Sequence, residues 1–182
     1  ISGARSFISD EEFKKAGASI VDDAQSLYAQ ADVVFKVQPP SADEVKLMKG
    51  GAIYMGNLAP LNNHDTLIAM NEKKVTGFAT EFIPRISRAQ SMDTLSSMAT
   101  LAGYKAVLIS ANHLGKIFPL LMTAAGSIPP ATTFVLGAGV AGLQAIATAK
   151  RLGSKVEAFD PRPAVEEQVK SLGATFVHME VP

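Results

Sequence analysis

The sequence predicts an α/β protein of two domains, each built on a parallel sheet, with a long helix joining them. Three features indicate this arrangement. Short helical and strand-like segments alternate through residues 1–80, and apolar residues recur at three- and four-residue steps from residue 91 onward. A strand, a glycine-rich turn and a helix then follow one another near residue 137. Both domains are expected to be incomplete in this chain.

The first domain contains two clear helix starts. Ser9 with Glu12, and Ser41 with Glu44, form capping boxes, in which each side chain bonds to the backbone N–H of the other residue. We expect helices at 9–15, 22–31, 41–49 and 64–73, and strands at 32–37, 52–55 and 75–79. This alternation implies a parallel sheet with helices on both faces.

A long amphipathic helix is predicted from Ser91 onward. Its apolar positions are Met92, Leu95, Met98, Ala102, Ala106 and Ile109. We expect the helix to run toward Ala125, with a kink before Pro119. The segment from Gly126 to Pro130 then marks a boundary, so the first domain is predicted to span 1–126 and to end with this connecting helix.

A second α/β unit is predicted over 127–182. Strands are expected at 132–136, 155–159 and 174–178, and helices at 140–152 and 163–172, with Gly153 as a C-cap. A complete doubly wound domain has several more strands, and an isolated half would expose a sheet edge and apolar helix faces. We therefore expect this unit to be the first half of a Rossmann domain and the natural protein to continue beyond Pro182.

The composition excludes several kinds of site. Lys plus Arg and Asp plus Glu each number 17, so the formal net charge is zero, whereas a nucleic-acid-binding protein is expected to be basic. The chain has no cysteine, which excludes a disulfide framework, a zinc–thiolate site and a cysteine nucleophile. Prolines and glycines interrupt the most apolar stretch, 117–149, so no segment is predicted to insert directly into a membrane.

The glycine-rich turn is the strongest chemical signal. A GxGxxG motif between a strand and a helix is typical of a dinucleotide site: its glycines allow a tight turn, a close approach of the pyrophosphate, and close packing of helix on strand. The pyrophosphate would lie at the helix N-terminus, where free N–H groups favour anions. The nucleotide-binding residues predicted here are Gly137, Gly139, Val140, Ala141 and Gly142.

Asp160 follows the second strand of this unit, eighteen residues after Gly142. A carboxylate at this place binds the adenosine ribose hydroxyls and repels a 2′-phosphate, so it favours NAD over NADP. Arg162 weakens this preference, because an arginine there could face a phosphate. The alternative reading is that Asp160 only turns its own backbone before Pro161.

The loop from Pro84 to Asp93 places two arginines, a glutamine and an aspartate before the long helix. Loops with such side chains often carry function. The alternative is that Arg85 and Arg88 are solvated and that Asp93 only stabilises the helix N-terminus, by about 0.3–1 kcal/mol.

Taken together, the segments Arg85-Ile-Ser-Arg-Ala-Gln-Ser-Met-Asp93 and Gly137-Ala-Gly-Val-Ala-Gly-Leu-Gln-Ala145 closely resemble the NAD(H)-binding component of proton-translocating nicotinamide nucleotide transhydrogenases. This component belongs to the alanine dehydrogenase/transhydrogenase family. The likeness extends nearly throughout 81–178 and more loosely over 1–80. It implies two Rossmann-like domains with NAD in the cleft between them.

The resemblance also implies roles for individual residues. Those expected to hold the nicotinamide and its ribose are Arg85, Gln90, Asp93 and Ser96; those expected to hold the pyrophosphate and adenosine are Gly137, Gly139, Gly142 and Asp160. Hydride would pass directly from NADH to NADP⁺ on a separate NADP(H)-binding component. Such a transfer requires alignment more than a general acid or base. His64, His113 and His178 lie outside the proposed loops and are expected to be structural or solvated.

The implied enzyme is an oxidoreductase within a larger complex. A membrane-embedded component would couple hydride transfer to proton translocation, and the family implies a homodimer. The protein would then sit at the cytoplasmic face of a bacterial inner membrane, or on the matrix side in mitochondria, held there by its partner subunits.

Two other functions stay open. In alanine dehydrogenases, which the chain resembles at Phe35-Lys36-Val37, the lysine serves the substrate carboxylate and a histidine acts as acid and base. Here Asn57 stands at the histidine's place, and an amide cannot carry a proton at neutral pH. The second alternative is a non-catalytic module that only binds NAD(H).

Overall fold

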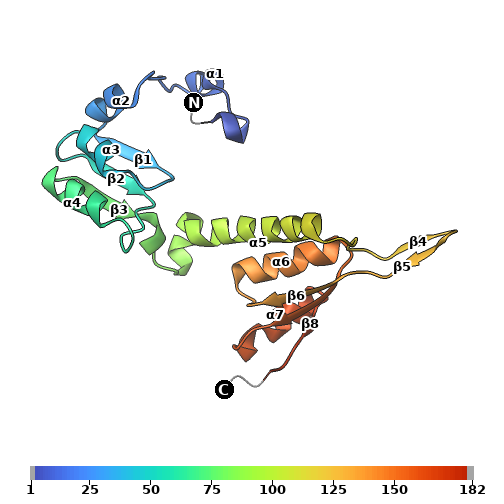
Figure 1. The fold of residues 1–182 in the computed structure, drawn as a ribbon. Coiled ribbons are helices and arrows are strands. Elements are labelled where there is room, and N and C mark those ends of the chain that lie inside the picture. The colour runs from blue at the N-terminus through green and yellow to red at the C-terminus, as the bar shows by residue number, and fades with distance from the viewer. Residues whose placement is uncertain (1–2, 180–182) are drawn as a thin grey trace. The chain divides into compact units, whose positions relative to one another are not determined.

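The computed structural model describes residues 3–179, and the chain divides into two compact units, 1–92 and 93–182 (Figure 1). Within the described residues, each unit is α/β and contains a three-stranded parallel sheet. The long helix α5 lies between the two sheets in the sequence. The predicted fold class is therefore confirmed.

The first unit has the strand order β1-β2-β3. Its strands are β1 (Val33–Lys36), β2 (Ile53–Gly56) and β3 (Thr76–Ala79). Its helices are α1 (Asp10–Lys15), α2 (Ala24–Gln30), α3 (Ala42–Leu47) and α4 (His64–Glu72). Short 3-10 helices occur at η1 (Ala4–Ser6), η2 (Thr80–Phe82) and η3 (Ser87–Met92).

Both predicted capping boxes are present. The backbone N–H of Glu12 donates to the Ser9 hydroxyl at 3.3 Å, and that of Ser9 donates to the Glu12 carboxylate at 2.7 Å. Ser41 and Glu44 form the same pair of bonds at the start of α3, at 3.1 and 2.8 Å. Local sequence therefore fixes where α1 and α3 begin.

The two faces of the first sheet differ. Val34 and Tyr54 are buried on the face that carries the helices. On the opposite face Phe35, Met55 and Phe78 pair in register across the three strands and are 74%, 39% and 54% exposed. The expectation of helices on both faces is therefore wrong for the described residues. Because both faces are apolar, the alternation pattern could not distinguish the covered face from the open one.

The second unit begins with α5 (Thr94–His113), followed by an antiparallel hairpin and a parallel sheet of strand order β6-β7-β8. The hairpin strands are β4 (Leu121–Thr123) and β5 (Gly126–Ile128). The sheet and its helices are β6 (Thr132–Leu136), α6 (Val140–Arg151), β7 (Lys155–Phe159), η4 (Pro163–Val165), α7 (Glu166–Ser171) and β8 (Thr175–Phe176).

The helix α5 is shorter than predicted. It ends at His113 with Leu114 as its C-cap, whereas we expected it to run toward Ala125. The apolar residues beyond Pro119 form the hairpin instead, which turns into β5 at Gly126 with φ +135°. A short apolar run fits a strand as well as a helix, and a proline interrupts helical hydrogen bonding, so the pattern alone did not decide between them.

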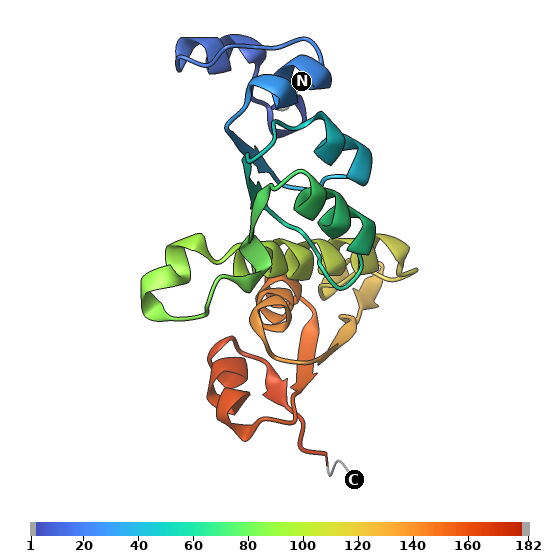
Figure 2. The same cartoon turned by 90° about the vertical axis from the view of Figure 1, so that its left-hand side faces the viewer.

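The division between the units also differs from the expected boundary at residue 126. It falls between Met92 and Asp93, so α5 belongs to the second unit. The reason is packing: α6 lies between α5 and the sheet of β6, β7 and β8 (Figures 1 and 2). No helix among residues 3–179 combines the length and apolar composition needed to cross a membrane.

The close contact of α5 with α6 depends on Gly103. This residue is buried, and a Cβ atom there would overlap the backbone carbonyl of Ala141 in the first turn of α6. Val107, one turn further along α5, and Ile146 of α6 belong to the same buried cluster. Gly103 therefore sets how close α5 comes to the start of α6.

We predict that Gly103→Ala lowers the free energy of unfolding by about 1–3 kcal/mol, because backbone cannot yield to the added methyl group as a flexible side chain can. Urea denaturation measures the change. Gly115→Ala is the matched control, since a Cβ at Gly115 meets no atom within 4 Å. Equal stabilities of the two variants would contradict the assigned role of Gly103.

Candidate functional site

The glycine-rich turn joins β6 to α6, and its three motif glycines differ in their surroundings. Gly137 has φ +92°, a backbone conformation that side chains other than glycine rarely adopt. A Cβ at Gly142 would overlap the carbonyl of Gly137, so its absence lets the helix approach the strand. A Cβ at Gly139 would meet nothing within 4 Å. The backbone at Gly139 is therefore open to a ligand.

The N-terminus of α6 faces this open backbone. Gly139 is its N-cap and offers no side-chain acceptor. In the first turn of a helix, here Val140, Ala141 and Gly142, the N–H groups have no acceptor within the helix. Together with the helix dipole they form a local site for an anion in a chain without net charge.

Asp160 follows β7 and is 5% exposed. Its Oδ2 accepts from the backbone N–H of Ala138 at 2.8 Å, and its Oδ1 accepts from that of Arg162 at 2.9 Å. One carboxylate thus ties the glycine-rich turn to the loop after β7. The bond to the N–H of Arg162 is also the backbone turn of the alternative reading, so Asp160 turns its own loop and lies beside the glycine motif as well.

Arg162 also binds Asp160 through its side chain. Its Nε and Nη2 donate to Oδ1 and Oδ2, each at 2.9 Å. The Arg162 guanidinium, together with the backbone N–H groups of Ala138 and Arg162, holds the pKa of the Asp160 carboxyl well below its usual range. Asp160 is therefore a carboxylate at neutral pH. The sequence did not predict this pairing.

A cavity of about 270 Å³ adjoins Asp160 at the carboxyl ends of β7 and β8. It is lined by Phe159, Asp160, Pro161, Pro163, Phe176, His178 and Met179. The expectation that His178 lies away from the site is therefore wrong, while His64 and His113 are exposed elsewhere. The available signal was position: His178 follows a strand parallel to β7, and the ends of parallel strands share one edge of a sheet.

The loop before α5 presents its predicted residues differently. Arg85 and Gln90 are exposed in the first unit. Asp93 is the N-cap of α5; its carboxylate accepts from the Ser96 N–H at 2.9 Å and from the Ser96 hydroxyl at 2.7 Å. The structure brings Asp93 and Ser96 together, and it brings the glycine-rich turn together with Asp160 and Arg162. The ligand-binding roles of all these residues remain predictions.

Comparison with known proteins identifies the family. The family description "Alanine dehydrogenase/PNT, N-terminal domain" matches residues 2–102, and its C-terminal domain counterpart matches residues 106–181. The chain belongs to the alanine dehydrogenase/PNT family. The family resemblance found in the sequence is therefore confirmed.

Relatives occur on both branches of the alanine dehydrogenase/PNT family. A segment of the NAD(P) transhydrogenase alpha subunit of Rhodospirillum rubrum, which is a protein of its own there, is 50% identical over 98% of this chain and 48% of that protein. The crystal structure of a transhydrogenase from Sinorhizobium meliloti matches with a TM-score of 0.93 at 50% identity, over 97% of this chain and 52% of that one. An alanine dehydrogenase of Methanococcus maripaludis is 31% identical over 87% of this chain and 43% of that protein. The chain thus spans about half the length of these relatives.

Lys36 is the residue that would serve a substrate carboxylate on the alanine dehydrogenase branch of the family. Its Nζ donates to both carboxylate oxygens of Glu44, at 2.6 and 2.7 Å. Tyr28 donates to the same carboxylate at 3.0 Å. Burial raises the pKa of Glu44, but the hydrogen bonds from Lys36, Ser41 and Tyr28 together lower it below its usual value. The charge of Lys36 is therefore neutralised within the protein.

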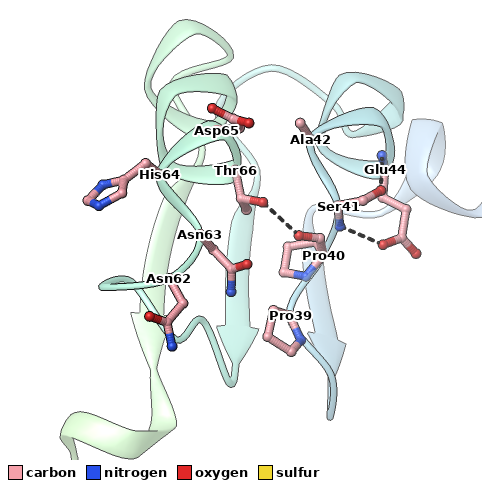
Figure 3. A pocket seen from close by; sticks show the side chains of 10 residues that line it. All are labelled: Pro39, Pro40, Ser41, Ala42, Glu44, Asn62, Asn63, His64, Asp65 and Thr66. Atoms are coloured by element: carbon pink, nitrogen blue, oxygen red, sulfur yellow. Dashed lines mark hydrogen bonds between the residues drawn. The ribbon is translucent and has the colours of Figure 1, made fainter.

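A pocket of about 760 Å³ lies beside this ion pair, between the first turns of α3 and α4 (Figure 3). It is lined by Pro39, Pro40, Ser41, Ala42, Glu44, Asn62, Asn63, His64, Asp65 and Thr66. The Thr66 hydroxyl donates to the Pro40 carbonyl at 3.0 Å and joins the two sides. The charged carboxylates in this lining are Glu44 and Asp65, so the pocket is poorly suited to an amino acid's carboxylate.

We predict that Glu44→Gln lowers the free energy of unfolding by about 1–2 kcal/mol at pH 7, because Lys36 loses its partner. The folded-state pKa of Glu44 is lowered, so this stabilisation is present above the unfolded-state pKa of about 4.3 and is lost as the pH falls through the folded-state pKa. Urea denaturation between pH 7 and pH 3 tests this.

Glu11→Gln is the control for this experiment, since Glu11 pairs with Lys14 at an exposed position where its side chain is 72% accessible. Such a pair contributes little to stability. If the stabilities of Glu44→Gln and Glu11→Gln follow the same pH profile, the assigned role of the Lys36–Glu44 pair is wrong.

Proposed function

We propose that this chain is the NAD(H)-binding part of a NAD(P) transhydrogenase, which holds NADH while hydride passes to NADP⁺ on a partner domain. The observation that carries the proposal is an open glycine-rich turn tied to a buried, ionised carboxylate on the next strand. The 50% identity to the Rhodospirillum rubrum transhydrogenase subunit supports it. The alanine dehydrogenase relative is less similar, at 31%.

The residues around the turn fit NAD(H). The N–H groups of Val140, Ala141 and Gly142 would take the pyrophosphate, and the bare backbone of Gly139 leaves room for it. Asp160 would accept hydrogen bonds from the adenosine ribose hydroxyls, while its negative charge would repel the 2′-phosphate of NADP(H). The local charge therefore favours NAD(H).

At the nicotinamide end we assign Arg85, Gln90, Asp93 and Ser96 to the ring and its ribose. The mutual hydrogen bonds of Asp93 and Ser96 fix both side chains at the start of α5, and the side chains of Arg85 and Gln90 are exposed and free to meet a ligand. The bound nicotinamide supplies the hydride, a proton with two electrons, directly to the oxidised ring of NADP⁺. The protein residues then have to orient the donor ring and exclude water rather than move a proton.

This function requires partners. We propose an NADP(H)-binding component that carries the acceptor and a membrane-embedded component that couples the transfer to proton translocation. We further propose that the protein is a homodimer held at the cytoplasmic face of a bacterial membrane, or at the matrix side in mitochondria, through those partners.

Two observations disfavour alanine dehydrogenase activity. Lys36 is neutralised by Glu44, and Asn57, which stands at the place of the family's acid–base histidine, cannot carry a proton. A non-catalytic NAD(H)-binding module differs from the proposed function in one measurable respect: it would bind NADH yet transfer no hydride when the partner components are added.

We predict that the protein binds NADH and excludes NADPH, and that Asp160→Ala weakens NADH binding about ten- to hundredfold through loss of charged hydrogen bonds to the ribose. Titration followed by nucleotide fluorescence measures both, with a low protein background because the chain has no Trp. Glu157→Ala, an exposed carboxylate on β7, is the control. Equal affinity of the parent protein for the two nucleotides would contradict the role of Asp160.

We predict that Gln90→Ala slows hydride transfer about ten- to hundredfold in the complex reconstituted with the partner components, because the donor ring loses alignment. Deuterium passing from C4-deuterated NADH into NADP(H), read by mass spectrometry, measures the rate. Gln30→Ala, at an exposed glutamine of α2, is the control. Thermal unfolding should be the same for both variants, and a normal transfer rate in Gln90→Ala would remove Gln90 from the site.

A further inference from the structure

Four hydrogen bonds occupy the Asp160 carboxylate, two on each oxygen. Oδ1 accepts from the backbone N–H and from Nε of Arg162, both at 2.9 Å. Oδ2 accepts from the backbone N–H of Ala138 at 2.8 Å and from Nη2 of Arg162 at 2.9 Å. Each oxygen therefore has one backbone donor and one guanidinium donor. Each carboxylate oxygen has about two lone-pair positions, so this set is full.

The backbone donors and the guanidinium donors differ in how firmly they are held. The N–H groups of Ala138 and Arg162 belong to the two loops that shape the site. The Arg162 side chain is 62% exposed, whereas that of Asp160 is 4% exposed. The guanidinium can therefore leave for solvent at small cost, since exposed ion pairs are weak, while the carboxylate stays oriented by the backbone.

Departure of the guanidinium would free one acceptor position on each oxygen of Asp160. A ribose presents two hydroxyl donors on neighbouring carbons, and a carboxylate with one free position per oxygen can accept both. The guanidinium presents the same pattern through its parallel Nε and Nη2 donors, the fork by which arginine matches a carboxylate. The two groups therefore compete for the same two positions.

We propose that Arg162 is an internal competitor of the ribose: in the nucleotide-free protein it fills the acceptor positions of Asp160 that a cis-diol takes, and nucleotide binding displaces it. This inference rests on the proposed function, because it assumes that Asp160 receives the adenosine ribose. It assigns Arg162 to setting the affinity for the diol rather than to gripping a phosphate.

The test compares two ligands that differ only in the diol: adenosine 5′-monophosphate and its 2′,3′-dideoxy analogue, each measured by displacement of fluorescent NADH. We expect Arg162→Ala to bind the monophosphate about two- to fivefold more tightly than the parent protein, the range set by release of one exposed ion pair. The dideoxy analogue should bind both proteins equally, because it needs no acceptor on Asp160.

Two further variants complete the test. Arg162→Lys keeps the charge without the fork and should also gain affinity for the diol, so it decides the matter if Arg162→Ala folds poorly by thermal unfolding. Arg151→Ala, at an exposed arginine in the last turn of α6, should leave both affinities unchanged.

The outcomes separate the competitor role from the proposed function. If the parent binds NADH but the Arg162 variants bind the monophosphate no more tightly, or gain equally for the dideoxy analogue, the competitor role is wrong and the NADH site stands. Weaker binding by Arg162→Ala would likewise overturn it, since Arg162 would then be a ligand contact. Failure of the parent to bind NADH or the monophosphate would overturn the proposed function and the competitor role with it.

Discussion

The glycine-rich turn and the loop after β7 are held together by one buried carboxylate. Asp160 reaches from the end of its strand to the N–H of Ala138, inside the GxGxxG motif, and also accepts from the N–H of Arg162. A buried charge is tolerated only when it is paired and hydrogen-bonded, and Arg162 supplies the opposite charge from solvent. The group that favours one nucleotide over another is therefore also the group that organises the loop on which that nucleotide would lie.

A second constraint acts on the other end of the motif. The first turn of α6 is fixed from two sides, by Gly142 against the strand β6 and by Gly103 of α5 against Ala141. At both places the missing side chain lets backbone meet backbone. The N–H groups that point toward an anion are thus set by packing rather than by the loop alone, and a rigid first turn needs no rearrangement to receive a ligand.

The first unit bears on the branch of the family through its chemistry. A lysine that could hold a substrate carboxylate is present at position 36, yet Glu44 and Tyr28 form a closed hydrogen-bonded group around its charge. Burial and the Glu44 carboxylate raise the pKa of Tyr28 to about 12, so it donates as a neutral phenol. In this chain the lysine has a structural role, which is why we place the site of chemistry with the nicotinamide nucleotide.

Local sequence by itself determined the helix starts at Ser9 and Ser41, the turn at Gly137 and the order of strands and helices, because each depends on residues three or four positions apart. It also placed Asp160 at a strand end. It could not determine that α5 stops at His113, because the apolar run beyond fits strand and helix alike.

The tertiary structure alone decided which face of the first sheet the helices cover, that α5 packs with the second unit through Gly103, and that His178 joins Asp160 beside one cavity. It alone showed that Arg162 fills the acceptor positions of Asp160. These features depend on contacts between segments brought together by folding, and periodicity along the chain records only which side of an element is apolar, not which neighbour it meets.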